Sequence, residues 1–176
     1  MTIIVKNKDT LTFENFEFKC SIGKLGLTKN KYEGDKKTPK GIYNIGNLYF
    51  RKDRNPKPYT KLKCIPIQKN MGWCHDPKNK NKYNKLIKIE KHLKHDILYR
   101  KDYKYDYLIP VEYNTKNIKP GKGSAIFIHL TKNYEKTLGC IALKKNDLLI
   151  LVFLFINLKR IKKSFFFKAT HPKVLL

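Results

Sequence analysis

Cys140 and His129 are the two side chains of this sequence whose types and spacing could carry out nucleophilic chemistry. Cys140 follows Gly139, where the backbone can turn sharply and present N–H groups to a bound oxyanion. His129 lies eleven residues upstream, at the end of an apolar stretch. Imidazole can take the thiol proton, sulfur can attack a carbonyl, and imidazolium can protonate the leaving amine. The same imidazole and N–H groups would favour the thiolate, which predicts that Cys140 is the most alkylation-sensitive cysteine at neutral pH.

A purely structural interpretation of both residues has to be weighed against this chemistry. Free cysteines are among the most buried residue types, and one that follows a glycine at a strand start is often part of a core. His129 could likewise be an interior histidine whose ring N–H donates a hydrogen bond to a backbone carbonyl.

The surrounding stretches predict short β-strands, because apolar residues alternate with polar ones between turn residues. His129 ends the apolar stretch 124–130, and Cys140 begins the next one. Other strands are expected at 2–6, 14–22, 41–50 and 105–114. A short helix is expected over 84–95. A helix is expected over 148–157, capped by Asn146 or Asp147. Since residues 148–156 are apolar on all sides, this helix is expected to be buried or to lie in an interface.

The motif around the pair is a histidine, a spacer, and then a hydroxyl residue, any residue, glycine, cysteine and an apolar residue. It is formed here by His129, Thr137, Gly139, Cys140 and Ile141. In this arrangement the chain resembles the YkuD-type L,D-transpeptidases, and in particular their compact single-domain branch in Gram-negative bacteria.

Further stretches over residues 16–150 have the look of that branch and occur in the same order. They are Glu33-Gly34-Asp35, Thr38-Pro39-Lys40-Gly41, Gly72-Trp73-Cys74-His75-Asp76-Pro77, Tyr83-Asn84, Leu98-Tyr99-Arg100-Lys101-Asp102, Tyr105-Asp106, Tyr113-Asn114 and Gly121-Lys122-Gly123-Ser124. Three positions depart from the family pattern. Thr137 replaces the usual serine, Leu130 stands where many members have glycine, and Ala142 stands where better-known members carry an arginine.

The resemblance implies one catalytic domain over 1–176, a mainly β protein with a β-sandwich of the YkuD type and one or two helices. It implies attack by Cys140 on peptidoglycan stem peptides, with His129 as general base and then acid. The backbone N–H groups of Gly139 and Cys140, together with that of Leu138, would hold the oxyanion. It implies no metal and no organic cofactor.

Five residues are predicted to bind substrate, and for three of them a purely structural role is the alternative. Arg100 and Asp102 either form a structural ion pair or contact a substrate carboxylate. Trp73 is the only tryptophan and is either a core residue or a platform beside a sugar or peptide. Thr137 keeps the hydroxyl of the family serine, and Ser124 is a positional candidate at the start of the strand that carries His129.

The charge of the chain predicts attraction to polyanions. It has 39 basic and 14 acidic residues, for a net charge of +25, and only four of the basic residues are arginine. Anionic cell-envelope polymers fit this surface as well as nucleic acid does. Arginine forks for reading bases are scarce and no nucleic-acid-binding motif is present, so nucleic acid is the minority interpretation.

The remaining cysteines, Cys20, Cys64 and Cys74, show no CxxC spacing, which disfavours a zinc site. They are interpreted as packing residues, with a disulfide among them left open. The nine apolar residues 148–156 are too few for a membrane span of about 20. The basic-aromatic tail 158–176 is interpreted either as a contact to an anionic membrane surface or as a final strand.

The family's substrate places the predicted activity in the periplasm or cell envelope. Residues 1–7 contain no apolar segment of signal-peptide length. A non-standard export route, a missing presequence and a different, cytoplasmic activity all stay open. Two other functions also stay open: an L,D-carboxypeptidase-type hydrolase on the same stems, and a non-catalytic basic module that binds polyanions.

Overall fold

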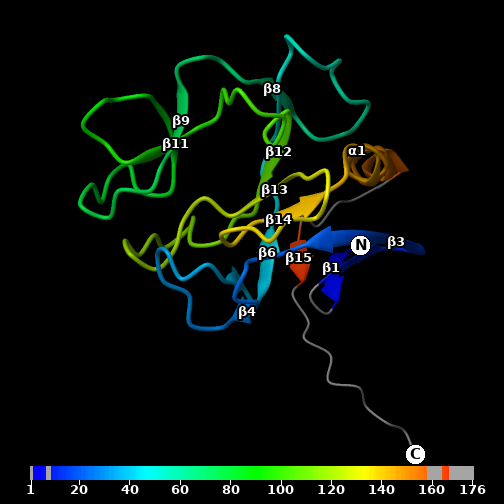
Figure 1. Cartoon of the computed structure of the whole chain (residues 1–176), viewed down its shortest axis with the longest axis horizontal. Coiled ribbons are helices and arrows are strands. Elements are labelled where there is room, and N and C mark those ends of the chain that lie inside the picture. Colours follow the sequence, from blue (N-terminus) through cyan, green and yellow to red (C-terminus); the bar gives the residue numbers. More distant parts are fainter. Residues whose placement is uncertain (1, 7–8, 158–163, 167–176) are drawn as a thin grey trace, which may run out of the picture.

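The structure is a computed structural model that describes residues 2–6, 9–157 and 164–166. In this part of the chain the fold is mainly β, with one α-helix, which confirms the predicted fold class. Figure 1 shows the strands of the largest sheet running through the middle of the molecule, with a smaller strand group on one side.

The largest sheet contains ten strands and connects segments from both ends of the chain. Its strands are β1 (Thr2–Lys6), β2 (Thr10–Phe13), β3 (Phe16–Ser21), β6 (Ile42–Asn44), β7 (Leu48–Phe50), β8 (Cys64–Pro66), β12 (Tyr107–Pro110), β13 (Phe127–Leu130), β14 (Ile141–Leu143) and β15 (Ser164–Phe166). Their order across the sheet is β6-β15-β1-β2-β3-β14-β13-β12-β7-β8. The strands β13 and β14 therefore lie near the centre, where neighbours support them on both sides.

Two predicted strands begin or break where the backbone turns. The predicted strand 14–22 begins at Phe16, because Glu14 has a φ of 53° and lies in the two-residue turn between the paired residues Phe13 and Phe16. The predicted strand 41–50 is divided into β6 and β7. Strand β15 confirms the final-strand interpretation for residues 164–166, since it pairs with β1 and β6. The rest of the tail 158–176 lies outside the described residues.

The predicted helix over 84–95 is wrong, because this segment contributes two strands of a second sheet. Strands β10 (Leu86–Lys88) and β11 (His95–Ile97) pair antiparallel with the two edges of β9 (Met71–Cys74). Along β10 only the middle residue is buried, which is a period of two and leaves no helical apolar stripe. A third, two-stranded sheet joins β4 (Leu27–Thr28) to β5 (Thr38–Pro39).

The C-terminal helix α1 (Lys145–Leu154) begins earlier than predicted and continues into a 3₁₀ turn, η1 (Phe155–Asn157). Its N-cap is Lys144, which makes no side-chain cap hydrogen bond, so the predicted caps Asn146 and Asp147 are wrong. Asp147 instead lies in the first turn, where its negative charge favours the helix dipole.

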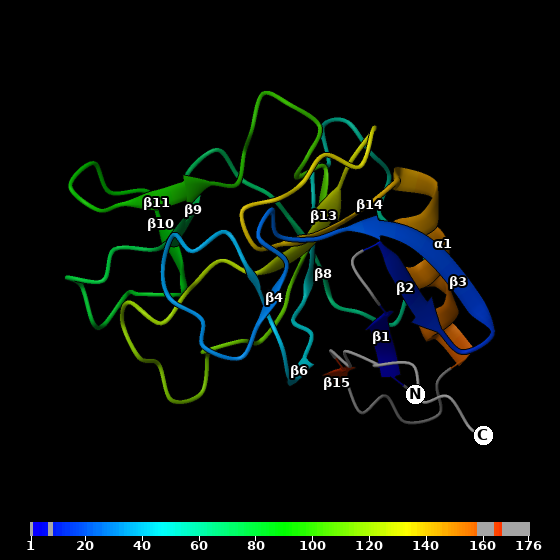
Figure 2. The ribbon, with the colours of Figure 1, turned by 60° about the horizontal axis from the view of Figure 1, so that its bottom comes forward.

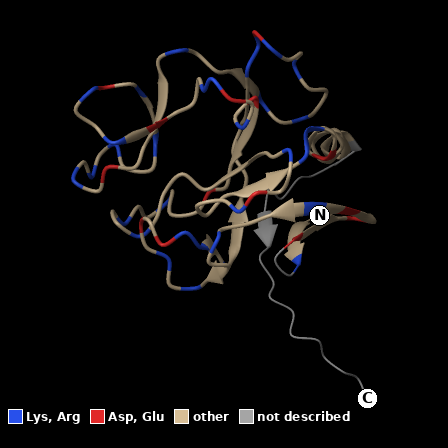
Figure 3. Ribbon diagram, in the orientation of Figure 1, with Lys and Arg blue, Asp and Glu red and all other residues tan. Residues whose placement is uncertain are grey.

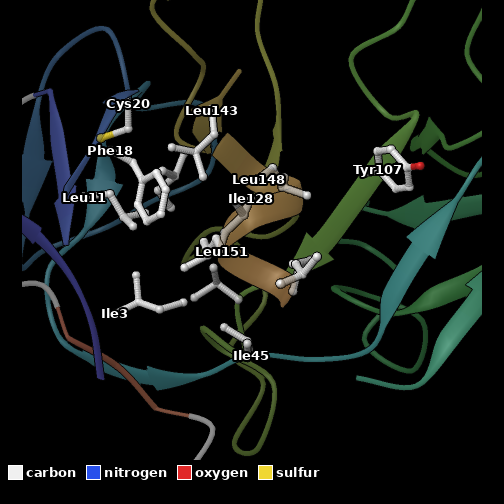
Figure 4. Packing of buried hydrophobic residues seen from close by; sticks show 14 of the residues in the cluster. Ile3, Leu11, Phe18, Cys20, Ile45, Tyr107, Ile128, Leu143, Leu148 and Leu151 are labelled. Carbon is white, nitrogen blue, oxygen red and sulfur yellow. The ribbon is translucent and has the colours of Figure 1, made fainter. Parts of the chain in front are cut away.

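One hydrophobic cluster fills the space between the large sheet and α1, and we call it the first core (Figure 4). Figure 2 shows α1 running alongside β1–β3. Side chains from both halves of the sheet meet the helix here; the labelled examples are Ile3, Leu11, Phe18, Cys20, Ile45, Tyr107, Ile128, Leu143, Leu148 and Leu151.

The opposite face of the sheet covers a second core, which includes Trp73, Tyr105 and Phe127. Strand β13 is buried on both faces: Ile128 and Leu130 belong to the first core, whereas Phe127 belongs to the second. Because side chains alternate along a strand, His129 lies on the same face as Phe127.

The first core predicts which helix residues carry stability. Leu151 is fully buried, so we expect Leu151→Ala to lower the free energy of unfolding by about 2–5 kcal/mol. The adjacent Ile150 is 43% exposed, and we expect Ile150→Ala to cost only about 0.5 kcal/mol. Urea unfolding of the two variants measures both values, and equal losses would contradict this packing.

Candidate active site

The register of β13 and β14 brings His129 and Cys140 to one face of the sheet. The two strands run parallel, with His129 opposite Ala142 and Ile128 opposite Ile141. Cys140 lies two residues before Ala142 and therefore points to the same side as Ala142 and His129. Both side chains line a cavity of about 370 Å³. The small side chain of Ala142 also lines this cavity, at the position where an arginine was expected from the family pattern.

The turn before Cys140 is held by two threonine hydroxyls. Thr137 Oγ1 donates to the carbonyl of Cys140 at 2.6 Å and accepts from the N–H of Gly139 at 3.1 Å. Thr38 is fully buried, and its hydroxyl donates to the carbonyl of Gly139 at 2.8 Å. Gly139 has a φ of 143°, and a Cβ there would lie 2.9 Å from the carbonyl oxygen of Lys37. Glycine is thus required here both by its backbone angle and by its surroundings.

The hydrogen bond from the Gly139 amide to Thr137 affects which backbone amides are free to bind an oxyanion. It already engages the Gly139 amide, so that amide would have to leave Thr137 before it could bind a substrate oxygen. The amides of Leu138 and Cys140 are the better candidates. Leu138 itself is 74% exposed, at the edge of the cavity.

The thiol of Cys140 is held by the backbone of the strand beside it. Its Sγ donates to the carbonyl of Ala125 and accepts from the N–H of Phe127, both at 3.3 Å. Among the described residues it makes no hydrogen bond with the imidazole of His129. Burial raises the pKa of the Cys140 thiol to about 12, against the weaker opposing effect of the Phe127 amide.

His129 is oriented by its own neighbour, because its Nδ1 lies 3.0 Å from the carbonyl oxygen of Leu130. A proton on Nδ1 leaves Nε2 free to accept one. The ring also packs against Tyr105, with 5.6 Å between the ring centroids. Burial lowers the pKa of His129 to about 4. Both shifts favour a neutral thiol and a neutral imidazole in the free protein, because burial outweighs the polar contacts, and they therefore run against the predicted preference for the thiolate.

Asn84, which the sequence analysis named only as part of the stretch Tyr83-Asn84 and without a role, fixes the segment that holds the thiol. Its side-chain oxygen accepts from Trp73 Nε1 at 3.0 Å and from the N–H of Ala125 at 3.1 Å. Its side-chain nitrogen donates to the carbonyls of Tyr113 and Asn114 at 2.9 and 2.8 Å. Ala125 has a φ of 51°, which is uncommon for a non-glycine residue and needs such support. A chain of contacts thus runs from Asn84 through Ala125 to Cys140.

The predicted substrate-binding residues divide into three that line the cavity and two that do not. Arg100, Thr137 and Ser124 line it. Asp102 does not line the cavity. Its carboxylate accepts two hydrogen bonds from the Arg100 guanidinium, at 2.8 and 2.5 Å. Trp73 lies in the second core, edge-on to Phe127, and supports the site from behind.

The cavity wall is more mixed in charge than the protein surface, on which lysines are spread widely (Figure 3). Lys31 lines it and forms a buried ion pair with Asp35. Glu33 accepts hydrogen bonds from Tyr83 and Ser124. In the part of the chain that the structure describes, no group of three His, Cys, Asp or Glu side chains could hold a metal ion, and all four thiols are free. Within the same residues no helix has the length and apolar content to cross a membrane.

A comparison with models of protein families identifies the class of domain that contains this cavity. The model of the L,D-transpeptidase catalytic domain, YkuD, matches residues 1–154. The chain belongs to the YkuD family.

The comparisons with solved structures and with curated proteins are less informative than the family match. The chain is similar to the helical cell shape determining protein Pgp2 from Campylobacter jejuni, at 18% identity and a TM-score of 0.47, over 97% of this chain and 49% of that one. It is also similar to Bd1075 of Bdellovibrio bacteriovorus, at 17% identity and a TM-score of 0.46, over 94% of this chain and 46% of that one. The chain spans about half the length of these structures. No curated protein matches it.

The contacts of Asn84 predict a positioning role that can be measured. We expect Asn84→Ala to lower kcat/KM at least tenfold and to change the alkylation rate of Cys140, because Ala125 loses its anchor. It also leaves buried groups unpaired, each costing about 1–3 kcal/mol, so the assay is run where circular dichroism shows the variant folded. Trp73→Phe removes only one of the four hydrogen bonds and is the control, with an expected loss below threefold. Unchanged kinetics in folded Asn84→Ala would contradict the role.

The neutral state of the pair predicts the pH dependence of thiol reactivity. Since the pKa of Cys140 is raised to about 12, we expect its alkylation rate in the free protein to keep rising above pH 9. Iodoacetamide labelling followed by peptide-resolved mass spectrometry gives this rate for Cys140 alone. A plateau near neutral pH would show that a thiolate–imidazolium pair exists instead.

Proposed function

We propose that this protein is a peptidoglycan L,D-transpeptidase that forms crosslinks between stem peptides through a thioester on Cys140. The observation that carries the proposal is the placement of Cys140 and His129 on one face of two paired strands, in a cavity that both side chains line. Membership of the YkuD family supports the same chemistry.

In the acylation step the thiol leaves the carbonyl of Ala125 and gives its proton to Nε2 of His129. Sulfur forms a bond to the carbonyl carbon of an L-configured centre of the donor stem, and the carbonyl oxygen takes the negative charge. We assign the binding of that charge to the amides of Leu138 and Cys140. Loss of one donor of this kind typically costs about 2.7–4 kcal/mol of barrier. The C–N bond then breaks, and His129 protonates the departing D-amino acid.

In the second step the thioester is taken by an amine of another stem. His129 accepts a proton from this amine, and the new C–N bond forms as the C–S bond of the thioester breaks. His129 then returns the proton to the sulfur of Cys140, which regenerates the thiol. Water in place of the amine would release a free acid, which is the product of an L,D-carboxypeptidase.

Binding of the donor carboxylate is assigned to Arg100. Two of its guanidinium nitrogens, Nε and Nη2, are held by Asp102, so the side chain is fixed at the cavity wall while Nη1 lies outside these bonds. A planar guanidinium in a fixed position suits a carboxylate better than a flexible lysine does. Thr137 and Ser124 contribute to the wall, although their hydroxyls are engaged by Cys140 and Glu33.

The substrate places this activity at the cell envelope, and the lysine-rich surface suits the anionic polymers found there. The charge of +25 would raise the local concentration of such a polymer and would act less strongly at high salt, because the Debye length is only about 8 Å at 0.15 M.

The experiment is incubation of the purified protein with a tetrapeptide stem that ends in a D-amino acid, followed by mass spectrometry of the products. We expect release of the terminal D-amino acid and a crosslinked dimer, and we expect Cys140→Ala to abolish both. Cys64→Ala is the matched control, since Cys64 does not line the cavity, and it should retain activity within about twofold, as expected away from a site.

The products separate the alternatives. A shortened monomer without the dimer, even with acceptor stems in excess, would identify a carboxypeptidase. A folded protein that neither turns over the stem nor forms an acyl-enzyme with a carbapenem would instead be a binding module.

A further inference from the structure

Asp96 is a carboxylate in the same cavity that neither the family motif nor the proposed mechanism uses. It is the middle residue of β11, opposite Trp73 of β9, and it lines the cavity together with Cys140 and Arg100. Its carboxylate makes no hydrogen bond and no ion pair with any of the described residues. In a chain with a net charge of +25, a carboxylate in a cavity has many potential cationic partners, so the absence of a direct partner in the described structure calls for a physical reason.

The groups that face Asp96 do not neutralise it. His75, His95 and Arg100 are close enough to stabilise its charge, and Glu33 opposes that effect. Burial is the largest influence and raises the pKa of Asp96. The guanidinium of Arg100 is committed to Asp102 by two hydrogen bonds. A partly buried carboxylate in these surroundings is a ready acceptor for an incoming cation.

In the free protein, the charge of Asp96 works against the chemistry of the site. It raises the pKa of the Cys140 thiol, on which the nucleophile depends, and also that of the Tyr105 phenol. A negative group beside a nucleophilic thiol is unfavourable unless a positive group joins it when substrate binds.

Tyr105 provides a second and independent sign that the cavity takes a polar ligand. Its side chain is 92% buried and lines the cavity, and its hydroxyl makes no hydrogen bond with any of the described residues. The ring is fixed by Phe127 and His129, at centroid distances of 5.8 and 5.6 Å, and the Arg100 guanidinium lies 5.0 Å from its centre. A fixed hydroxyl without a partner is a donor prepared for an oxygen of a ligand.

We propose that Asp96 determines substrate specificity by binding a primary ammonium group of the acyl donor, while Tyr105 and Arg100 bind the carboxylate on the same amino-acid centre. The proposal rests on the proposed function and adds to it which residues of this chain bind the two charges of a zwitterionic amino-acid centre on the donor. The cavity contains both complementary parts: the Asp96 carboxylate, which has no partner among the described residues, and the Tyr105 hydroxyl together with the Arg100 guanidinium.

This assignment also couples recognition to reactivity. An ammonium group bound to Asp96 cancels the charge that opposes thiolate formation, so the correct donor lowers the pKa of the Cys140 thiol as it binds. A donor whose amine is blocked would leave that opposition in place.

The test compares two donor stem peptides that are identical except that the amine of the proposed zwitterionic group is free in one and acetylated in the other. Isothermal titration calorimetry on the Cys140→Ala protein measures binding without turnover. We expect the free amine to bind at least tenfold more tightly, and we expect the added substitution Asp96→Asn to reduce that ratio to below twofold. Glu17→Gln, which removes an exposed carboxylate on β3, is the matched charge control and should leave the ratio unchanged.

A second measurement uses the free protein with Cys140 present. We expect Asp96→Asn to increase the rate at which iodoacetamide alkylates Cys140 at a given pH, because a negative charge next to the thiol is removed. A merely structural aspartate would not produce this increase.

The outcomes separate this proposal from the proposed function. Asp96→Asn protein that still prefers the free amine tenfold, or that loses affinity for both peptides equally, would overturn the role of Asp96. A wild-type protein that binds the free amine selectively yet releases no D-amino acid would leave Asp96 as the ammonium site and reject the transpeptidase.

Discussion

The parallel pairing of β13 with β14 is the constraint on which the candidate site depends. Its register places His129 opposite Ala142, and Cys140, the last residue of the connection before β14, then lies on the same face of the sheet. Parallel neighbours usually need a crossover of about a dozen or more residues, commonly a helix. Here residues 131–140 make the connection without a helix, and several of them form the cavity wall. The short connection therefore builds the cavity and the nucleophile turn together.

Burial on both faces of these strands gives the site its rigidity and sets its electrostatics. Ile128 and Ile141 are locked into the first core, whereas Phe127 and the partly buried Cys140 belong to the second. The same burial disfavours charge, which raises the pKa of the thiol and lowers that of the imidazole. Nucleophilic attack must then be coupled to proton transfer within the neutral pair. Under the proposed mechanism, we expect the thiol to become more reactive when a bound substrate brings a positive charge into the cavity.

The sequence predicted the parts of this arrangement that are local in the chain. Alternating apolar residues predicted the mainly β fold and the strand that carries His129. The same approach failed over 84–95, where the pattern is short and a tertiary partner, β9, determines the structure. It also assigned no role in the site to Thr38 or Asn84. Their hydrogen bonds reach 101 and 41 residues along the chain, and contacts at such separations leave no periodic signal. The raised pKa of the Cys140 thiol was missed for a related reason, because burial is a property of the folded environment.

The distribution of charge connects the surface of the protein to its cavity. Lysines and arginines are spread along the ribbon in Figure 3, and such a distribution of charge attracts anionic polymer without regard to its detailed structure. The cavity instead places the carboxylate of Asp96 near the guanidinium of Arg100, and opposite charges in a partly buried space distinguish one arrangement of ligand charges from another. Attraction by the surface alone would bring many anions to the cavity, most of which lack a cation to meet Asp96. In our proposal, Asp96 selects among the ligands that the basic surface attracts, and we expect the Cys140 thiol to gain reactivity with a ligand that satisfies both charges.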